Sequence, residues 1–149
     1  MPDMEKDLLA KEVLEKMYAN DRFSQWLGIE PVKAGAGSSV LRMTIRRDML
    51  NGFGIAHGGI TYSLADSALA FASNSHGRKA VSVETSVSHT EPLVEGDVIT
   101  AVAEELSLSN KIGVYQIRIT RQDNKLVALF KGTVYRTSKL WFDEKEGKN

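Results

Sequence analysis

The chain has 149 residues, enough for one domain with a sizeable core, and 42% of them are hydrophobic and 26% charged. Its 19 Lys and Arg residues balance its 19 Asp and Glu residues, so no overall positive field exists to attract nucleic acid or an acidic membrane surface. The chain has no cysteine, which excludes disulfides, zinc–thiolate sites and thiol nucleophiles.

The first residues predict helical structure. Between Asp3 and Ala19, apolar residues recur at helical spacing and charges occupy the other face, which predicts an amphipathic surface helix within residues 1–22. The apolar positions of this helix are Leu8, Leu9, Val13, Leu14 and Met17. A short turn is predicted at Phe23–Leu27, ended by Gly28. Acidic residues near the start argue against a secretory signal, so with the lack of cysteine we expect a cytoplasmic protein.

Two strands are predicted next, around a glycine turn at residues 35–37. They cover Ile29–Lys33 and Val40–Arg46. In the second strand, Leu41, Met43 and Ile45 alternate with Arg42, Thr44 and Arg46, the period of a strand with one buried face. Arg42, Arg46 and Arg47 also form a short basic cluster, for which a solvated strand face is the simpler interpretation and contact with a phosphorylated ligand the alternative.

The segment Met49–Gly77 differs from the rest of the chain, because Asp66 is its only Asp, Glu, Lys or Arg. It begins with a glycine-rich run that ends at Gly59, and a helix is predicted from Ile60 to about Ser75. Alanine on most sides is typical of a helix that packs closely against other elements. Polar residues interrupt the segment, so it is not transmembrane.

The remainder of the chain is predicted to form strands before a polar tail at residues 143–149. The expected strands are Ala80–Thr90, Val98–Leu108, Gly113–Arg121 and Leu126–Thr137. This order of elements indicates an α+β fold, in one domain of residues 1–149, with a sheet that curls around one helix. A single helix does not cover both faces and both edges of such a sheet, so we expect self-association.

Asp66 is the first candidate functional residue. An ionised carboxylate in a close-packed helix is costly unless it is paired or has a function. Composition alone leaves two interpretations open. Asp66 is either a structural acid, which points out at a gap on the helix surface or bonds to Ser63 or Ser67, or a catalytic acid.

The Gly58–Gly59 pair at the start of this helix is the second candidate. The first N–H groups of a helix lack intrahelical partners and lie at the positive end of its dipole, so one of them can stabilise negative charge on a carbonyl oxygen. A plain helix entry is the alternative. Asp66 lies about two turns into the helix, so at a ~1.5 Å rise per residue it is about 10 Å from the N–H of Gly58. We therefore expect the acid of one chain to meet the glycine of an antiparallel second chain.

His76 and His89 are expected to be structural, whereas His57 is a candidate because Gly58 follows it.

These candidates belong to a longer pattern. The run of Asn51, Gly52, Gly54, His57, Gly58 and Gly59, followed by Leu64, Ala65 and Asp66, resembles the PaaI-type (phenylacetate-pathway) branch of the hotdog-fold thioesterases. The resemblance extends from about Trp26 to the final strand and includes Val81–Glu84 and Pro92–Asp97. It implies the hotdog fold, an antiparallel sheet wrapped around a central helix.

The resemblance also implies roles for individual residues. Asp66 is expected to act as nucleophile or general base, and the backbone N–H of Gly58 to polarise the thioester carbonyl across a dimer interface. Asn51 and His57 would position the thioester or the attacking water, and Ser82 would orient that water. The residues expected to bind substrate are Gly59, Asn110, Lys111 and Gly113, with Arg78 or Lys79 as partners of the CoA phosphates.

These observations predict an acyl-CoA thioesterase that releases the free acid and CoA from an aryl- or medium-chain acyl-CoA. The sequence has no Gly-x-Ser-x-Gly motif, which disfavours a serine hydrolase, and its three histidines lack metal-ligand spacing, which disfavours a metallohydrolase. We therefore expect no metal, and no cofactor either, because CoA is part of the substrate. Neither nucleic acid nor membrane is an expected partner. A homodimer is expected to form the site and a homotetramer the whole assembly. A non-catalytic acyl-CoA-binding module and a hotdog enoyl-CoA hydratase or dehydratase are the alternatives.

Overall fold

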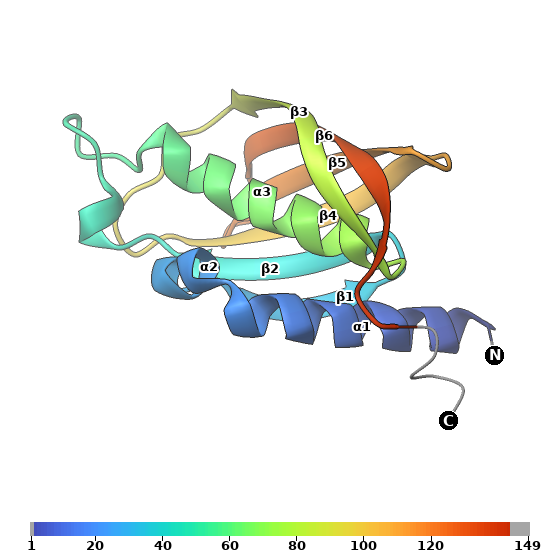
Figure 1. Cartoon of the computed structure of the whole chain (residues 1–149). Helices are drawn as coiled ribbons and strands as arrows, with labels where there is room; N and C mark the ends of the chain where they lie inside the picture. The colour runs from blue at the N-terminus through green and yellow to red at the C-terminus, as the bar shows by residue number, and fades with distance from the viewer. Residues whose placement is uncertain (1, 144–149) are drawn as a thin grey trace.

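Helix α3 (Gly58–Asn74) lies across a six-stranded antiparallel sheet that curls around it (Figure 1). The computed structural model describes residues 2–143. The other elements, in chain order, are α1 (Pro2–Asn20), α2 (Arg22–Leu27), β1 (Glu30–Gly35), β2 (Ser38–Thr44), η1 (Arg47–Met49), β3 (Arg78–His89), β4 (Val98–Leu108), β5 (Ile112–Arg121) and β6 (Leu126–Leu140). The predicted α+β fold class is therefore confirmed, and so are the N-terminal helix and the central helix.

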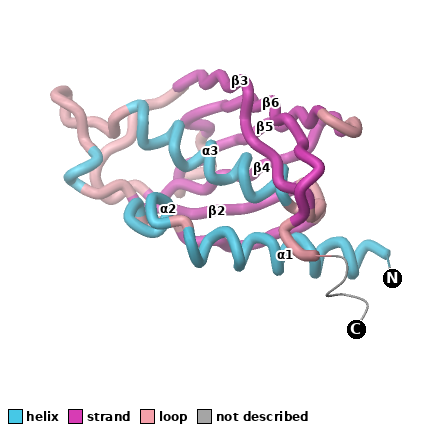
Figure 2. The backbone as a smooth tube through the Cα atoms, viewed as in Figure 1, coloured by secondary structure: helices cyan, strands magenta, loops and turns pink. Residues whose placement is uncertain are grey.

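The strands are arranged in the order β1-β2-β4-β5-β6-β3, and every neighbouring pair is antiparallel. Strand β3, which follows α3 in the chain, pairs with the last strand β6 and not with β4. Strands β1 and β3 are therefore the two edges of the sheet. The long loop between η1 and α3 extends beyond the sheet at one end of the molecule (Figure 2).

Helix α3 is buried because its side chains are small and apolar on the sides that face the sheet. The positions predicted to pack, Leu64, Ala65, Ala68, Leu69 and Ala72, are at most 1% exposed. On the facing strand β6, glycine is required at one point of close approach. A side-chain carbon on Gly132 would lie 2.5 Å from Cδ2 of Leu69.

The alternation predicted for β2 is confirmed, since Leu41 and Met43 are buried while Arg42 is exposed. The amphipathic prediction for α1 holds at Val13 and Leu14, which are buried, but it is wrong at Leu8, which is 56% exposed. Leu8 lines an open groove between α1 and the end of β1, where the helix and the strand leave room between them.

The two edge strands differ in character. Strand β1 contains Pro31, which has no backbone N–H, and a bulge separates Pro31 from Lys33 in its pairing with β2. Strand β3 contains no proline, and its apolar side chains Val81 and Val83 are 57% and 60% exposed. The alternation predicted for this strand therefore does not give a buried face near its start within a single chain.

Two boundaries differ from the predictions for local reasons. Helix α3 begins at Gly58, two residues earlier than predicted, because His57 caps it. Strand β6 continues to Leu140 because it pairs there with Arg78. Residues 144–149 of the predicted polar tail lie outside the described residues, and the one-domain prediction stays a prediction. Within residues 2–143, no helix is both long enough and apolar enough to cross a membrane.

We expect Gly132→Ala to lower the free energy of unfolding by about 1–3 kcal/mol, because the added carbon must displace the buried Leu69 side chain. Urea unfolding followed by circular dichroism measures this change. Gly52→Ala is the matched control, since a side-chain carbon there has no atom within 4 Å, and we expect it to change stability by less than about 0.5 kcal/mol. Equal stability of the two variants would contradict close packing at Gly132.

Candidate active site

The start of α3 leaves one backbone N–H free. His57 is the N-cap residue, and its Nδ1 accepts a hydrogen bond of 2.9 Å from the N–H of Gly59. The N–H of Ile60 donates to the backbone oxygen of His57 at 2.9 Å. Among the described residues the N–H of Gly58 has no acceptor, and Gly58 is exposed. The cap therefore occupies the Gly59 donor and leaves the Gly58 donor available to a ligand.

The carboxylate of Asp66 has no hydrogen-bond partner among residues 2–143, although the residue is partly buried. The interpretation of a structural acid bonded to a neighbouring serine is wrong, because both serines bond elsewhere. Ser63 donates to the backbone oxygen of Gly59 at 2.7 Å, and the Ser67 hydroxyl lies 2.8 Å from the hydroxyl of Ser24 on α2. An unpaired carboxylate on a helix that is otherwise packed is typical of a functional group.

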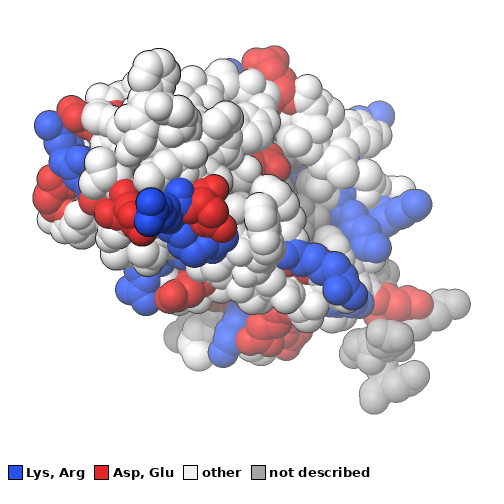
Figure 3. Space-filling model, turned by 90° about the vertical axis from the view of Figure 1, so that its left-hand side faces the viewer, with Lys and Arg blue, Asp and Glu red and all other residues white. Residues whose placement is uncertain are grey.

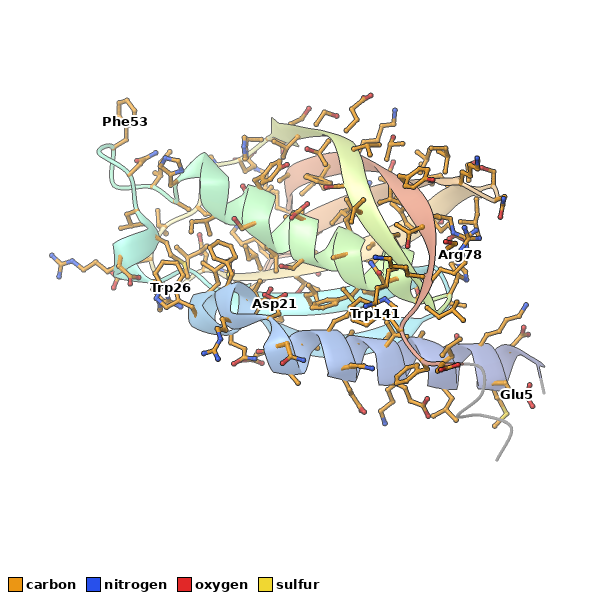
Figure 4. The ribbon with its side chains drawn as sticks, viewed as in Figure 1. Glu5, Asp21, Trp26, Phe53, Arg78 and Trp141 are labelled. Atoms are coloured by element: carbon orange, nitrogen blue, oxygen red, sulfur yellow. The ribbon has the colours of Figure 1, made fainter. Side chains whose placement is uncertain are left out.

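Burial raises the pKa of the Asp66 carboxyl, and the negative charge of Asp21 raises it further. Asp21 lies at the junction of α1 and α2, below the middle of α3 (Figure 4). Its own carboxylate caps α2, because it accepts hydrogen bonds from the backbone N–H and the hydroxyl of Ser24. A raised pKa makes the ionised form of Asp66 a stronger base than an ordinary aspartate.

Asp66 and Ser82 line the same small cavity, which has a volume of about 230 Å³. The rest of its lining is Leu69, Ala70, Ser73, Ala80, Val81 and Val134. Strand β3 thus brings Ser82 into the cavity that the Asp66 carboxylate lines, and most of this cavity is apolar. The predicted roles of Asp66 as nucleophile or base and of Ser82 in orienting the water need the two side chains in one cavity.

A second cavity, of about 380 Å³, lies at the start of α3 and brings Asn51 and Gly58 together. The Oδ1 atom of Asn51 accepts the N–H of Phe53 at 2.9 Å, which shapes the loop, and Phe53 points into solvent at the loop tip (Figure 4). This cavity is also lined by Thr61 and His89. Sequence reasoning treated His89 as structural, because nothing in the pattern of β3 indicates that its end lies against the first turn of α3.

A single chain therefore separates the predicted catalytic groups into two cavities. Asp66 and Ser82 share one of them, Asn51 and Gly58 share the other, and His57 lines neither. A larger groove of about 550 Å³ between α1 and β1 contains none of the predicted site residues.

The residues predicted to bind CoA lie at the opposite end of the sheet from the start of α3. Arg78 is held there by the turn between β4 and β5, since it donates to the side-chain and backbone oxygens of Asn110 at 3.2 and 2.8 Å. Lys111 is exposed in that turn, and the Lys79 ammonium lies 4.9 Å from the ring centre of Trp141 (Figure 4). Gly113 is buried in β5, where a side-chain carbon would lie 2.8 Å from Tyr115, so close packing explains this glycine.

Charges of both signs are mixed over the end of the molecule that carries the η1–α3 loop (Figure 3). Arg42 pairs with Glu30 at 3.1 Å and Arg46 pairs with Asp48 at 3.2 Å. These pairs support the interpretation of the short basic cluster as a solvated surface. No group of three or more His, Cys, Asp or Glu side chains in residues 2–143 is placed to hold a metal ion.

Comparison with known proteins places this geometry in a family. The model of the thioesterase superfamily matches residues 53–128. The chain is 41% identical to the acyl-coenzyme A thioesterase PaaI of Escherichia coli over 80% of this chain and 86% of that protein. The structure of the E. coli PaaI protein, from the phenylacetic acid degradation operon, superposes with a TM-score of 0.89 and 37% identity and covers 90% of this chain and 97% of that one. A mutant of the phenylacetic acid degradation protein PaaI from Thermus thermophilus superposes with a TM-score of 0.76 and 39% identity, over 78% of this chain and all of that one, 100%.

We expect Asp66→Asn to raise the free energy of unfolding at pH 7, because the buried carboxylate destabilises the folded state when it is ionised. The folded chain binds the Asp66 proton more tightly than the unfolded chain does. The wild type therefore regains this stability as the pH falls towards the ordinary aspartate value of about 3.9, and the difference between the two proteins disappears there. Urea unfolding at about pH 7 and about pH 3 measures the effect.

Asp123→Asn is a control of opposite sign for this experiment. The hydrogen bond from Arg121 lowers the pKa of Asp123 to about 2, so its removal is expected to destabilise the protein at pH 7. A wild type that is more stable than Asp66→Asn at pH 7 would contradict the burial argument.

Proposed function

The chain belongs to the PaaI-type branch of the thioesterase superfamily, hotdog-fold thioester hydrolases, and we propose that it hydrolyses an acyl-CoA to the free acid and CoA. The observation that carries this proposal is that α3 has both an unpartnered, partly buried carboxylate at Asp66 and a free N-terminal N–H at Gly58. Thioester hydrolysis needs both groups, one to generate the attacking nucleophile and one to stabilise the charge that develops on the carbonyl oxygen.

We propose Asp66 as the general base. Its carboxylate takes a proton from a water molecule held between Asp66 and Ser82, and the resulting hydroxide adds to the thioester carbon. The Gly58 N–H binds the carbonyl oxygen as it gains negative charge, and the tetrahedral intermediate then expels the CoA thiolate. The cavity that Asp66 shares with Ser82 supports this route, as does the raised pKa of Asp66. Direct attack of the carboxylate on the thioester carbon, to form an anhydride, is the alternative.

The proposed site is formed by two chains. Tyr62 lies midway between Gly58 and Asp66 along α3, and its hydroxyl is 2.6 Å from that of Thr85, which lies near the midpoint between Ser82 and His89 along β3. A two-fold axis beside this pair places Asp66 of one chain against the partner's Gly58, and repeats the arrangement in a second site.

The free edge of β3 supports this dimer. The edge carries the exposed Val81 and Val83, and antiparallel pairing of two β3 strands would bury both side chains and continue the sheet from one chain to the next. A homotetramer made of two such dimers is the expected assembly, and a cytoplasmic location stays a prediction.

The cavity beside Asp66 favours a compact acyl group. Its volume of about 230 Å³ and its lining of Leu69, Ala70 and Val134 suit one aromatic ring or a short to medium apolar chain. We therefore propose an aryl- or medium-chain acyl-CoA, with the CoA moiety directed towards Asn110 and Lys111. The hydrogen bonds of Arg78 to Asn110 in the β4–β5 turn leave Lys79 and Lys111 as the better phosphate partners.

We expect Asp66→Asn to lower kcat by at least about 100-fold, because a neutral amide cannot accept the proton of the water. Release of free CoA from phenylacetyl-, benzoyl- and octanoyl-CoA measures this, with His76→Gln as a control that replaces a histidine hydrogen-bonded to Glu105. Undiminished hydrolysis by Asp66→Asn would contradict the mechanism. Binding without turnover would indicate a binding module, and water addition to an enoyl-CoA would indicate a hydratase. A single turnover in ¹⁸O-labelled water tests the two routes. General-base attack puts the label directly into the acid product, whereas label in Asp66 requires the anhydride, through attack of water on its Asp66 carbonyl carbon.

Mixed dimers test whether each site uses both chains. Gly58→Pro removes the N–H without breaking the helix, because proline is favoured at the first position of a helix and His57, with φ −60° and ψ 138°, has the backbone conformation accepted before proline. Gly58→Ala is the matched control, since it adds a side-chain carbon at the same place, 3.2 Å from Nε2 of His89, but keeps the N–H. We expect Asp66→Asn and Gly58→Pro to be inactive separately. After joint unfolding and refolding, each mixed dimer regains one intact site, which gives about a quarter of the wild-type activity if the chains pair at random. A mixture as inactive as its components would contradict the shared site.

A further inference from the structure

The imidazole of His89, at the end of β3, lies against the first turn of α3 and faces the same cavity as Gly58. A side-chain carbon on Gly58 would lie 3.2 Å from Nε2 of His89. The other ring nitrogen, Nδ1, lies 3.2 Å from the hydroxyl of Thr61 on α3. His89 is therefore held next to the glycine whose N–H has no acceptor.

The Thr61 hydroxyl fixes which nitrogen carries the proton in the neutral ring. This hydroxyl donates its single hydrogen to the backbone oxygen of Gly58 at 3.1 Å. It can therefore only accept from Nδ1, so Nδ1 carries a hydrogen in both the neutral and the charged ring. Nε2, which faces the cavity, is the position that gains or loses the proton.

We infer that His89 is a second contact for the carbonyl oxygen of the substrate, beside the backbone N–H of Gly58. When Nε2 is protonated, it donates a charged hydrogen bond to the oxygen as negative charge develops there. When Nε2 is deprotonated, it presents a lone pair and gives no such stabilisation. This inference rests on the proposed function, because it needs a carbonyl oxygen bound at Gly58. Thr61 is a positioning residue, since it acts only through the ring.

The titratable groups around His89 come from three places. Glu91 lines the same cavity and forms an ion pair of 3.0 Å with Lys125 of the β5–β6 turn, so its charge is already compensated. His57 caps α3 and accepts the Gly59 N–H through Nδ1. In the proposed dimer, the partner's Asp66 faces this cavity, and its negative charge favours the protonated ring.

The sign of the pH dependence follows from the two required protonation states. Hydrolysis needs Asp66 ionised and benefits from His89 protonated, so the contribution of His89 is greatest at the acid end of the pH range and is lost towards the alkaline end. A variant without the ring nitrogens still depends on Asp66. The ratio of wild-type to variant activity therefore isolates the His89 contribution.

The experiment compares kcat of the wild type and His89→Phe on phenylacetyl-CoA from about pH 5.5 to 8.5. We expect a ratio of about tenfold or more at the acid end, falling towards one at the alkaline end, with little change in KM. In His89→Gln the amide is a donor at every pH, so we expect intermediate activity and a flatter profile. His76→Gln, which alters a histidine at the other end of α3, is expected to follow the wild type throughout.

A ratio that does not change with pH, whatever its size, would overturn the inference, since a structural effect of the ring has no reason to follow its protonation. Absence of hydrolysis by the wild type would overturn the proposed function and this inference together, whereas hydrolysis unaffected by His89→Phe would overturn this inference alone. A ¹⁵N spectrum of the imidazoles gives a measurement that needs no variant. We expect His89 to carry its hydrogen on Nδ1 when neutral, and the opposite tautomer would overturn the inference.

Discussion

Close packing of α3 against the curled sheet is the constraint on which the rest of the structure depends. Small side chains along the helix and Gly132 on β6 let the sheet approach it, and the ring of Tyr62 packs at 5.4 Å from that of Phe130. The partly exposed positions of α3 past its first turn lie on one narrow face, because the later ones follow the first two at steps of three to four residues. They are Tyr62, Ser63, Asp66 and Ala70. A charge on this helix is tolerable only on that face, which is where the single acid of the segment lies.

The two groups of the proposed mechanism, the Asp66 carboxylate and the Gly58 N–H, lack the hydrogen-bond partners that polar groups in a folded chain usually have. The carboxylate of Asp66 has no hydrogen-bond donor and the N–H of Gly58 has no acceptor within the described chain, while their neighbours Ser63, Ser67 and Gly59 are all bonded. The carboxylate costs stability in the isolated chain because it is partly buried, whereas the exposed N–H of Gly58 is open to water. In the proposed mechanism, a substrate carbonyl and a water molecule supply the missing partners.

The parts of the fold that depend on periodicity could be predicted from the sequence. The burial of Leu41 and Leu69 follows from spacing alone, and the Asp66–Gly58 separation follows from helix geometry. Contacts between distant segments could not be predicted. The exposure of Leu8 depends on how α1 is positioned against β1, which the spacing of its apolar residues does not indicate. The contact between His89 and Thr61 depends on β3 packing against α3, and these two residues are 28 positions apart in the sequence.

The two edges of the sheet differ, and this difference limits the number of chains that can join edge to edge. A sheet with two open edges adds a further copy at each side and grows into a fibre. Here Pro31 removes a hydrogen-bond donor from the edge of β1. Strand β3 also has register shifts in its pairing with β6, between Arg78 and Ala80 and between Ser82 and Glu84, but it contains no proline, so every residue of this edge keeps its backbone N–H beside the exposed valines. Joining of strands through β3 uses the same edge on both chains, so it stops at two copies. Proline at one edge thus protects the molecule from polymerisation while the other edge stays free to pair.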